Sequence, residues 1–263
     1  MKNIVCPTII LKRIEVFFLR EWIEHHIKLG VDKFMIYDNG FQPTCAHKSD
    51  FKGSLRQITS DEKSSGVWTK KPDVNYHFDL SDSQIDDALR DIEKDFNSIV
   101  EIVPWVYGVN HNTNYPFSQG TMFSDCMRRY PDGSQWAHLC IDPDEFIVLY
   151  KDKNLKDLFK YGPEWKNHLC FQERIFAARE SGKPVRSIFN YEHDAWTRTK
   201  FLSPAFYWPG QTIISVHRVY PKKWMMYRVE PDVAKKYHYI GAAVSEYANC
   251  AFSNIDKTME KYI

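Results

Sequence analysis

The stretch FFLREWIEHHIKLGVDKFMIYDNG (residues 17–40) predicts a helix, a turn and a buried strand in direct succession. Apolar residues recur in its first part with the spacing of one helical face, at Leu19, Trp22, Ile23 and Ile27. Gly30 stands where helices commonly end in a left-handed glycine, and the apolar run KFMIYD (33–38) follows as a short strand. Because another apolar run, NIVCPTIIL (3–11), precedes the helix, this order predicts a parallel pair of strands with a crossover helix.

The alternation of helices and strands continues towards residue 150. Ser81 and Gln84 form a capping-box pattern that opens a helix, and apolar spacing extends this helix to residue 96. Three further elements are expected after it: a strand at 98–105, a helix at 118–130 and a strand at 135–141.

The remaining segments have weaker patterns. Residues 41–80 are polar and contain turn residues, so we interpret them as an extended loop or insertion. Beyond residue 150, short strands alternate with loops, as in QTIISVHRVY (211–220). We therefore expect an α/β fold with a mainly parallel central sheet flanked by helices, formed by a single domain over residues 1–263.

The composition of the 263 residues fits a folded domain with a substantial core. Apolar residues make up 43% and aromatic residues 15%, which argues against disorder. The net charge of +1 gives no field of one sign, so nucleic acid is not an expected partner. No CxxC pair occurs, which excludes zinc-ribbon and redox-motif sites, and the six cysteines are scattered: Cys6, Cys45, Cys126, Cys140, Cys170 and Cys250.

The location expected from the sequence is the cytoplasm. The apolar run IVCPTIILKRIEVFFL (4–19) contains charged residues and is followed by no small-residue cleavage site, so it does not resemble a secretion signal. No run of eighteen apolar residues suggests a membrane span. Cysteines within apolar runs fit a reducing compartment. Peripheral association with the inner face of the membrane stays open.

A cluster of three acids, Asp142, Asp144 and Glu145, lies in AHLCIDPDEFIVLY (137–150) between two apolar runs. Neighbouring carboxylates repel one another and resist leaving water, so an ion or solvent must neutralise them. The Asp-x-Asp spacing suits Mg2+ or Mn2+, which binds one or two carboxylates, waters and substrate phosphates. Ligands of open α/β sheets gather beyond the carboxyl ends of the strands, where Asp38 also falls. A surface turn after the strand is the alternative.

Four motifs in this chain resemble those of the GT-A glycosyltransferases of the family-2 and family-92 type. They lie in REWIEHHIKLGVDKFMIYDNG (20–40), SQGTMFSDCMRRY (118–130) and QWAHLCIDPDEF (135–146). The likeness covers about residues 3–150 in the right order and fades to fragments beyond them. It implies a GT-A fold with a nucleotide-sugar-binding half at 1–150 and an acceptor-binding half at 151–263.

The resemblance implies a polysaccharide-building enzyme that moves a sugar from a nucleotide-sugar, expected to be a UDP-sugar, to a glycan or glycolipid acceptor with inversion. It implies a divalent metal, Mn2+ or Mg2+, held by Asp142 and Asp144. The donor-binding residues that it implies are Lys12, Glu15, Asp38, Gln119 and Asp142. Two features depart from the family pattern: Lys12 and Glu15 are spaced differently, and Pro143 replaces an aliphatic residue between the two acids.

Several residues outside the acidic cluster allow two interpretations. Gln119 opens a helix, and helix N-termini favour phosphate, although an exposed first-turn glutamine is equally compatible. The resemblance implies one late histidine as a further metal ligand, either His217 or His238, and imidazole suits manganese. For His25 and His26 we expect structural roles, with one facing the core and the other solvent.

An inverting transfer needs a general base that takes the proton of the acceptor hydroxyl. Acids of the second half are the candidates: Glu173, Glu180, Glu192 and Asp194. Glu173 is favoured because it follows a predicted strand, NHLCFQE (167–173), and Asp194 is the second choice. Solvated surface acids are the alternative for each of them.

Two other functions compete with the transferase. A nucleotide-sugar- or glycan-binding protein with impaired catalysis would account for Pro143 in the acidic cluster. A nucleotidyltransferase would need a Gly-rich, basic loop after the first strand to hold a triphosphate. The segment PTIILKRIEVFF (7–18) contains no glycine, so this function ranks last.

Overall fold

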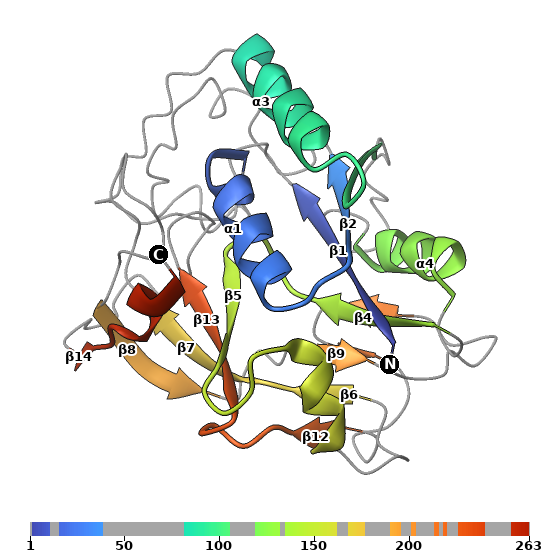
Figure 1. Cartoon of the computed structure of the whole chain (residues 1–263). Coiled ribbons are helices and arrows are strands. Elements are labelled where there is room, and N and C mark those ends of the chain that lie inside the picture. Colours follow the sequence, from blue (N-terminus) through green and yellow to red (C-terminus); the bar gives the residue numbers. More distant parts are fainter. Residues whose placement is uncertain are drawn as a thin grey trace, which may run out of the picture.

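The computed structural model describes the chain as a set of ordered stretches around two sheets (Figure 1). These stretches are residues 2–10, 16–38, 82–105, 119–131, 135–161, 168–176, 190–195, 201–203, 213–215, 218–219, 226–239 and 254–262. The loop expected at 41–80 lies outside the described residues.

The larger sheet has seven strands in the order β12-β6-β9-β4-β1-β2-β3. Their bounds are β1 (Asn3–Ile10), β2 (Lys33–Asp38), β3 (Val100–Pro104), β4 (Trp136–Cys140), β6 (His168–Cys170), β9 (Phe201–Ser203) and β12 (Met226–Arg228). β1 pairs in parallel with β2 and β4, and β2 pairs in parallel with β3. β9 is the reversed strand of this sheet, because it runs antiparallel to β4 and β6, while β12 is parallel to β6.

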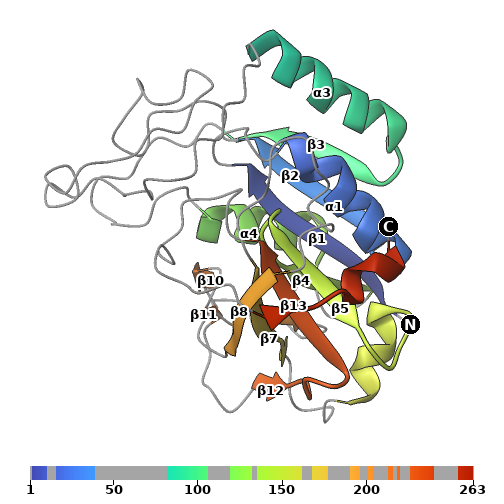
Figure 2. The same cartoon turned by 90° about the vertical axis from the view of Figure 1, so that its left-hand side faces the viewer.

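Three amphipathic helices cover the two faces of this sheet. Their bounds are α1 (Val16–Lys28), α3 (Asp82–Asp95) and α4 (Gln119–Arg129). α1 and α3 share one core with Ile4, Cys6 and Phe34, whereas α4 shares a second core with Val5 and Met35. Figure 2 shows α1 and α4 on opposite sides of β1 and β2. Strands covered on both faces bury successive residues, which explains the continuous apolar runs of β1 and β2.

A second, mixed sheet of five strands has the order β14-β8-β7-β13-β5. Its strands are β5 (Glu145–Leu149), β7 (Gln172–Phe176), β8 (Asn190–Ala195), β13 (Ala234–Tyr239) and β14 (Asn254–Ile255). The other described elements are β10 (Ile213–Ser215), β11 (Arg218–Val219) and the 3-10 helices η3 (Leu155–Lys160) and η6 (Thr258–Tyr262). The chain passes from the larger sheet to the second one between β4 and β5, and again between β6 and β7.

The α/β class and the mainly parallel sheet flanked by helices are confirmed. The helices and strands expected before residue 141 are present, with ends within two residues of those predicted. The single strand expected at 167–173 is wrong, because Cys170 ends β6 in one sheet and Gln172 begins β7 in the other. None of the described helices is long and apolar enough to cross a membrane.

Gly30 occupies the tight junction between α1 and β2 that the sequence predicts. Its φ is +92°, a conformation that glycine adopts at little cost. A Cβ at this position would collide with the side chain of Asn154. Asn154 caps η3 by accepting a bond from the Lys156 N–H at 2.9 Å, and the Leu155 N–H donates to the Leu29 C=O at 2.9 Å. The turn therefore packs directly against the segment that follows β5.

We predict that Gly30→Ala destabilises the fold by roughly 1–3 kcal/mol, because alanine is strained at positive φ. Urea unfolding of the wild type and the variant measures this difference in the free energy of unfolding. The double variant with Asn154→Ala separates collision from backbone strain, since removing Asn154 relieves only the collision. Equal stability of Gly30→Ala and wild type contradicts the prediction.

Candidate functional site

The acidic turn lies where the chain leaves one sheet for the other. β4 ends at Cys140 and β5 begins at Glu145, so Asp142 and Asp144 stand at the carboxyl end of a parallel strand. The Asp142 N–H donates to Oε2 of Glu145 at 2.8 Å, and the Glu145 N–H donates to the Asp142 C=O at 3.0 Å. Asp144 and Glu145 are only 4% and 2% exposed, so their charges need partners inside the protein.

Helix α1 holds the first half of β5 through side-chain bonds to its backbone. The Trp22 Nε1–H donates to the Glu145 C=O at 2.8 Å, and His25 Nε2 bonds the Ile147 C=O at 2.7 Å. The Ile147 N–H donates to Nε2 of His26 at 3.3 Å. Among the described residues, β5 is an edge strand that pairs with β13 alone. These side chains therefore satisfy buried backbone groups that another strand would otherwise pair.

Both histidines of α1 are fully buried, so the expectation that one of them faces solvent is wrong. His25 packs against Phe146 and against Tyr262 of the C-terminal segment, which cover this side of the helix. His26 Nδ1 bonds the Trp22 C=O at 2.9 Å, while its Nε2 accepts from Ile147. His26 is therefore a neutral imidazole, and burial lowers its pKa to about 3.

The C-terminal segment holds the second half of β5. The Tyr262 hydroxyl lies 3.4 Å from the Leu149 N–H nitrogen and 3.3 Å from the Leu149 C=O oxygen. The Lys261 ammonium donates to the same C=O at 2.9 Å. Asp256 anchors this segment to the second sheet through an ion pair with Arg174 of β7.

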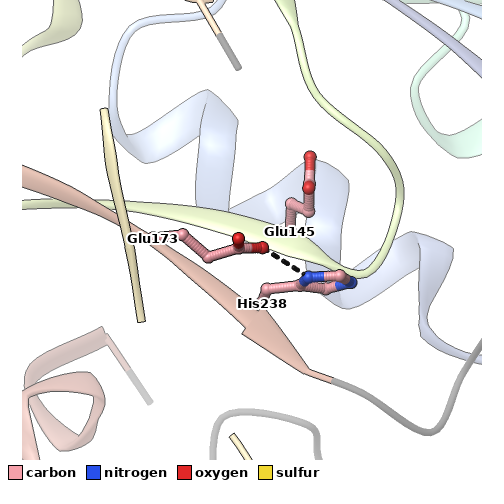
Figure 3. Close-up of side chains that lie close together, drawn as sticks. All are labelled: Glu145, Glu173 and His238. Carbon is pink, nitrogen blue, oxygen red and sulfur yellow. Dashed lines mark hydrogen bonds and ion pairs between the residues drawn. The ribbon is translucent and has the colours of Figure 1, made fainter. Parts of the chain in front are cut away.

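β13 brings a lysine and a histidine to the acidic turn. His238 lies opposite Glu145 of β5, and Lys236 lies opposite Glu173 of β7. Residues two apart in a strand point to the same face, so both cationic side chains reach the same group of carboxylates. Figure 3 shows Glu145, Glu173 and His238 side by side, with the bond between Glu173 and His238 dashed.

One continuous network of charged side chains joins five residues: Asp144, Glu145, Glu173, Lys236 and His238. His238 Nδ1 lies 2.6 Å from Oε1 of Glu173, and His238 Nε2 lies 3.4 Å from Oδ2 of Asp144. The Lys236 ammonium, fully buried, donates to Oε1 of Glu145 at 2.6 Å and to Oε1 of Glu173 at 3.0 Å. Oε2 of Glu173 is buried without a hydrogen-bond partner among the described residues. Three carboxylates thus share two neighbouring cationic groups.

The network shifts the pKa values of its members strongly. Burial by itself lowers the pKa of His238, but Asp144, Glu173 and Glu145 outweigh burial and raise it to about 10. Burial by itself raises the pKa of Glu173, whereas the bond from His238 and the charge of Lys236 lower it to about 2. At neutral pH the pair is therefore an imidazolium and a carboxylate.

Glu145, Glu173 and His238 form a group that could hold a metal ion, with ligand atoms within 4.8 Å of one another. Carboxylate and imidazole are suitable donors for a divalent transition metal. Two observations limit the fit of this triad. Lys236 already bonds both of its carboxylates, and a metal ion on His238 must displace a proton from the imidazolium.

Three of the residues expected in the site are brought together: Asp144, Glu173 and His238. Asp142 joins them through the bond between its N–H and Glu145. Asp38 ends β2, two strands away from β4, at the same edge of the parallel sheet.

Other expected site residues are described only in part or not at all. Gln119 begins α4 and Asp194 lies in β8 opposite Arg174, but their side chains lie outside the described part of the structure. Lys12, Glu15 and His217 lie outside the described residues altogether.

Lys236 is the member of this charged network that the sequence does not predict. A lysine between apolar and aromatic residues of AKKYHY (234–239) is unusual for a buried strand, and this composition is the available indication. Its partners cannot be named from the sequence, because they depend on the pairing of β13 with both β5 and β7.

Comparison with known proteins leaves the family of this chain open. No protein-family model matches the sequence, and no curated protein matches it significantly. The function must therefore be argued from the site itself.

We predict that His26 makes the fold less stable in acid. Its pKa is about 3 in the folded chain and about 6.5 in an unfolded one, so the unfolded chain binds the extra proton as pH falls below 6.5. By pH 4.5 this favours unfolding by roughly 2–3 kcal/mol. His26→Gln does not titrate, so its free energy of unfolding should fall less between pH 7 and pH 4.5.

Urea unfolding at both pH values measures this effect. His138→Gln is the matched control, because His138 is also buried with a pKa lowered to about 4 but lies in β4, away from β5. Each variant should reduce the loss of stability between pH 7 and pH 4.5 by the amount that its own histidine causes. If His26→Gln loses as much stability in acid as the wild type, His26 is not neutral in the folded chain.

Proposed function

We propose that the chain is a metal-dependent glycosyltransferase that moves a sugar from a nucleotide-sugar, a UDP-sugar, to a hydroxyl of a glycan or glycolipid acceptor with inversion. The observation that carries this proposal is the pairing of Asp144 with His238 at the carboxyl end of a parallel strand. Such strand ends are where open α/β sheets bind their ligands.

Contacts between the motifs on which the resemblance depends support the proposal. Trp22 of the first motif bonds the backbone of Glu145 in the acidic one. The Tyr37 hydroxyl donates to Oδ2 of Asp125 at 3.0 Å, which joins the motif at the end of β2 to the motif in α4. Motifs far apart in the sequence are thus joined in pairs by direct contacts, one pair on each face of the larger sheet.

In this proposal Asp142, Asp144 and Nε2 of His238 hold Mn2+ or Mg2+. Glu173 accepts the bond from Nδ1 of His238, the carboxylate partner that commonly orients a metal-binding histidine. The metal, when bound, neutralises the diphosphate of the donor and so stabilises the leaving nucleotide. Imidazole favours Mn2+ over Mg2+ among these ions.

The proposal assigns Glu173 an orienting role instead of the catalytic role first expected. A general base works best with a pKa near the working pH, whereas the pKa of Glu173 is lowered to about 2 by its bonds to His238 and Lys236 despite its burial. Asp194 then remains the candidate base that deprotonates the acceptor hydroxyl. Asp38, at the same edge of the sheet, contacts the nucleoside of the donor.

A binding protein without turnover is the second candidate function. Lys236 favours it, because an internal ammonium already neutralises part of the negative charge of Glu145 and Glu173 that a metal ion would otherwise balance. A panel of nucleotide-sugars with Mn2+ separates the two functions. Thermal stabilisation with slow release of free sugar supports the transferase, and stabilisation without release supports the binding protein. Stabilisation by no nucleotide-sugar contradicts both.

We predict that Asp144→Asn lowers metal-dependent release of sugar by about 100-fold or more, because the amide is a poorer metal ligand and loses its charge beside His238. Steady-state assays with Mn2+ measure the loss, and circular dichroism checks the fold. Asp232→Asn is the matched control, since this acid is exposed and pairs with Lys151 on the surface. Near-full activity of Asp144→Asn is incompatible with the proposed site.

We also predict that Asp38→Ala weakens binding of the nucleoside diphosphate by about 1–3 kcal/mol, the cost of a lost hydrogen bond to a polar ligand group. Calorimetric titration with UDP and Mn2+ measures this change. Asp38→Asn should lose less, because the amide can still bond the nucleoside. Unchanged affinity in Asp38→Ala removes this residue from the donor site.

A further inference from the structure

The position of Lys236 is set by both neighbours of β13. In the strand register Lys236 lies opposite Ile147 of β5 and opposite Glu173 of β7. Its ammonium is fully buried and bonds Oε1 of Glu145 at 2.6 Å and Oε1 of Glu173 at 3.0 Å. The ammonium is therefore a constant neighbour of both carboxylates in the folded chain.

The same two carboxylates belong to the triad of Glu145, Glu173 and His238. A divalent ion in this triad would need their oxygens as ligands at about 2.0–2.2 Å. One oxygen of each carboxylate, Oε1, already accepts a bond from Lys236, and a dication would lie next to a positive charge that repels it. Ammonium and metal ion therefore exclude each other here.

We infer that Lys236 is an internal counter-ion that closes the Glu145, Glu173 and His238 triad to divalent metals. The one nitrogen of His238 that faces away from the closed triad is Nε2, beside Asp144. Lys236 thus closes to a divalent metal the side of the imidazole that faces Glu173. This inference holds for an enzyme and for a binding protein alike, so it does not depend on the proposed function.

The buried carboxylate oxygens around Lys236 indicate that removing its ammonium would create a cation site. Oε2 of Glu173 has no hydrogen-bond partner among the described residues, although Glu173 is only 1% exposed. Without the ammonium, Glu145 and Glu173 would be left as two buried carboxylates beside the single positive charge of His238, an excess of negative charge that favours a further cation. A neutral residue at position 236 should therefore turn the triad into a metal site.

The experiment compares Mn2+ binding to the wild type and Lys236→Met in the absence of nucleotide. Methionine is unbranched and nearly as long as lysine, and it carries no charge. Titration followed by electron paramagnetic resonance should find one additional Mn2+ site in the variant, at least tenfold tighter than any such binding in the wild type. Mn2+ should also raise the melting temperature of the variant more than that of the wild type, because the ion replaces the lost counter-charge.

Two controls assign the new site. Lys235→Met removes a neighbouring buried lysine whose side chain points to the opposite face of β13, so it should bind Mn2+ like the wild type. Lys236→Met combined with Glu173→Gln should lose the additional site. Equal Mn2+ stoichiometry and affinity in Lys236→Met and the wild type overturns the inference.

Wild-type crystals soaked in Mn2+ give a test that does not require the variant to fold. Anomalous density within the triad overturns the inference, whereas density absent there, or found only beside Asp144 and Nε2 of His238, supports it. The result of this Mn2+ test does not depend on whether the proposed function is correct. An additional site in Lys236→Met together with no turnover of any nucleotide-sugar would reject the transferase and keep the inference.

Discussion

The acidic turn leads into β5, a strand with a partner strand on one side only in the described part of the chain. β5 pairs with β13, and on its other edge the backbone of Glu145 and Ile147 is bonded by Trp22, His25 and His26 of α1. Because β5 is buried, each of these backbone groups would lose its bond to water without replacement if the side chains were absent. The contact between α1 and β5 thereby joins the two sheets and fixes where the acids begin.

The buried carboxylates at the start of β5 require cationic partners, and β13 supplies them. Three carboxylates packed together in low dielectric would repel one another, so burial is tolerated only with cations among them. Lys236 and His238 meet this need from one face of one strand. The two cations differ in what they can bind. An ammonium has only hydrogen-bond donors, whereas an imidazole that gives up its proton can bind a metal.

The first half of the fold could be predicted because its pattern is local: apolar periodicity and Gly30 reveal α1 and β2 without knowledge of distant contacts. The second sheet could not, since its short strands are defined by pairing across long separations. The error at His25 and His26 has the same origin, because the helical period cannot show that a second layer covers the far side of α1. Asp144 and His238 could each be named as candidates. The register of β13 was needed to place His238 beside Asp144 and to bring Lys236 to the same group of carboxylates.

Some of the motifs that carry the resemblance concern folding and others concern chemistry, and the contacts distinguish the two. Trp22 and His26 bond the backbone of β5, so a protein that binds a nucleotide-sugar without transferring it would need them equally. Asp144 of the turn is different, because its carboxylate lies beside the imidazole ring of His238, 3.4 Å from Nε2. A likeness in the helix motif therefore supports the position of the turn, whereas the proposed chemistry depends on Asp142, Asp144 and Nε2 of His238.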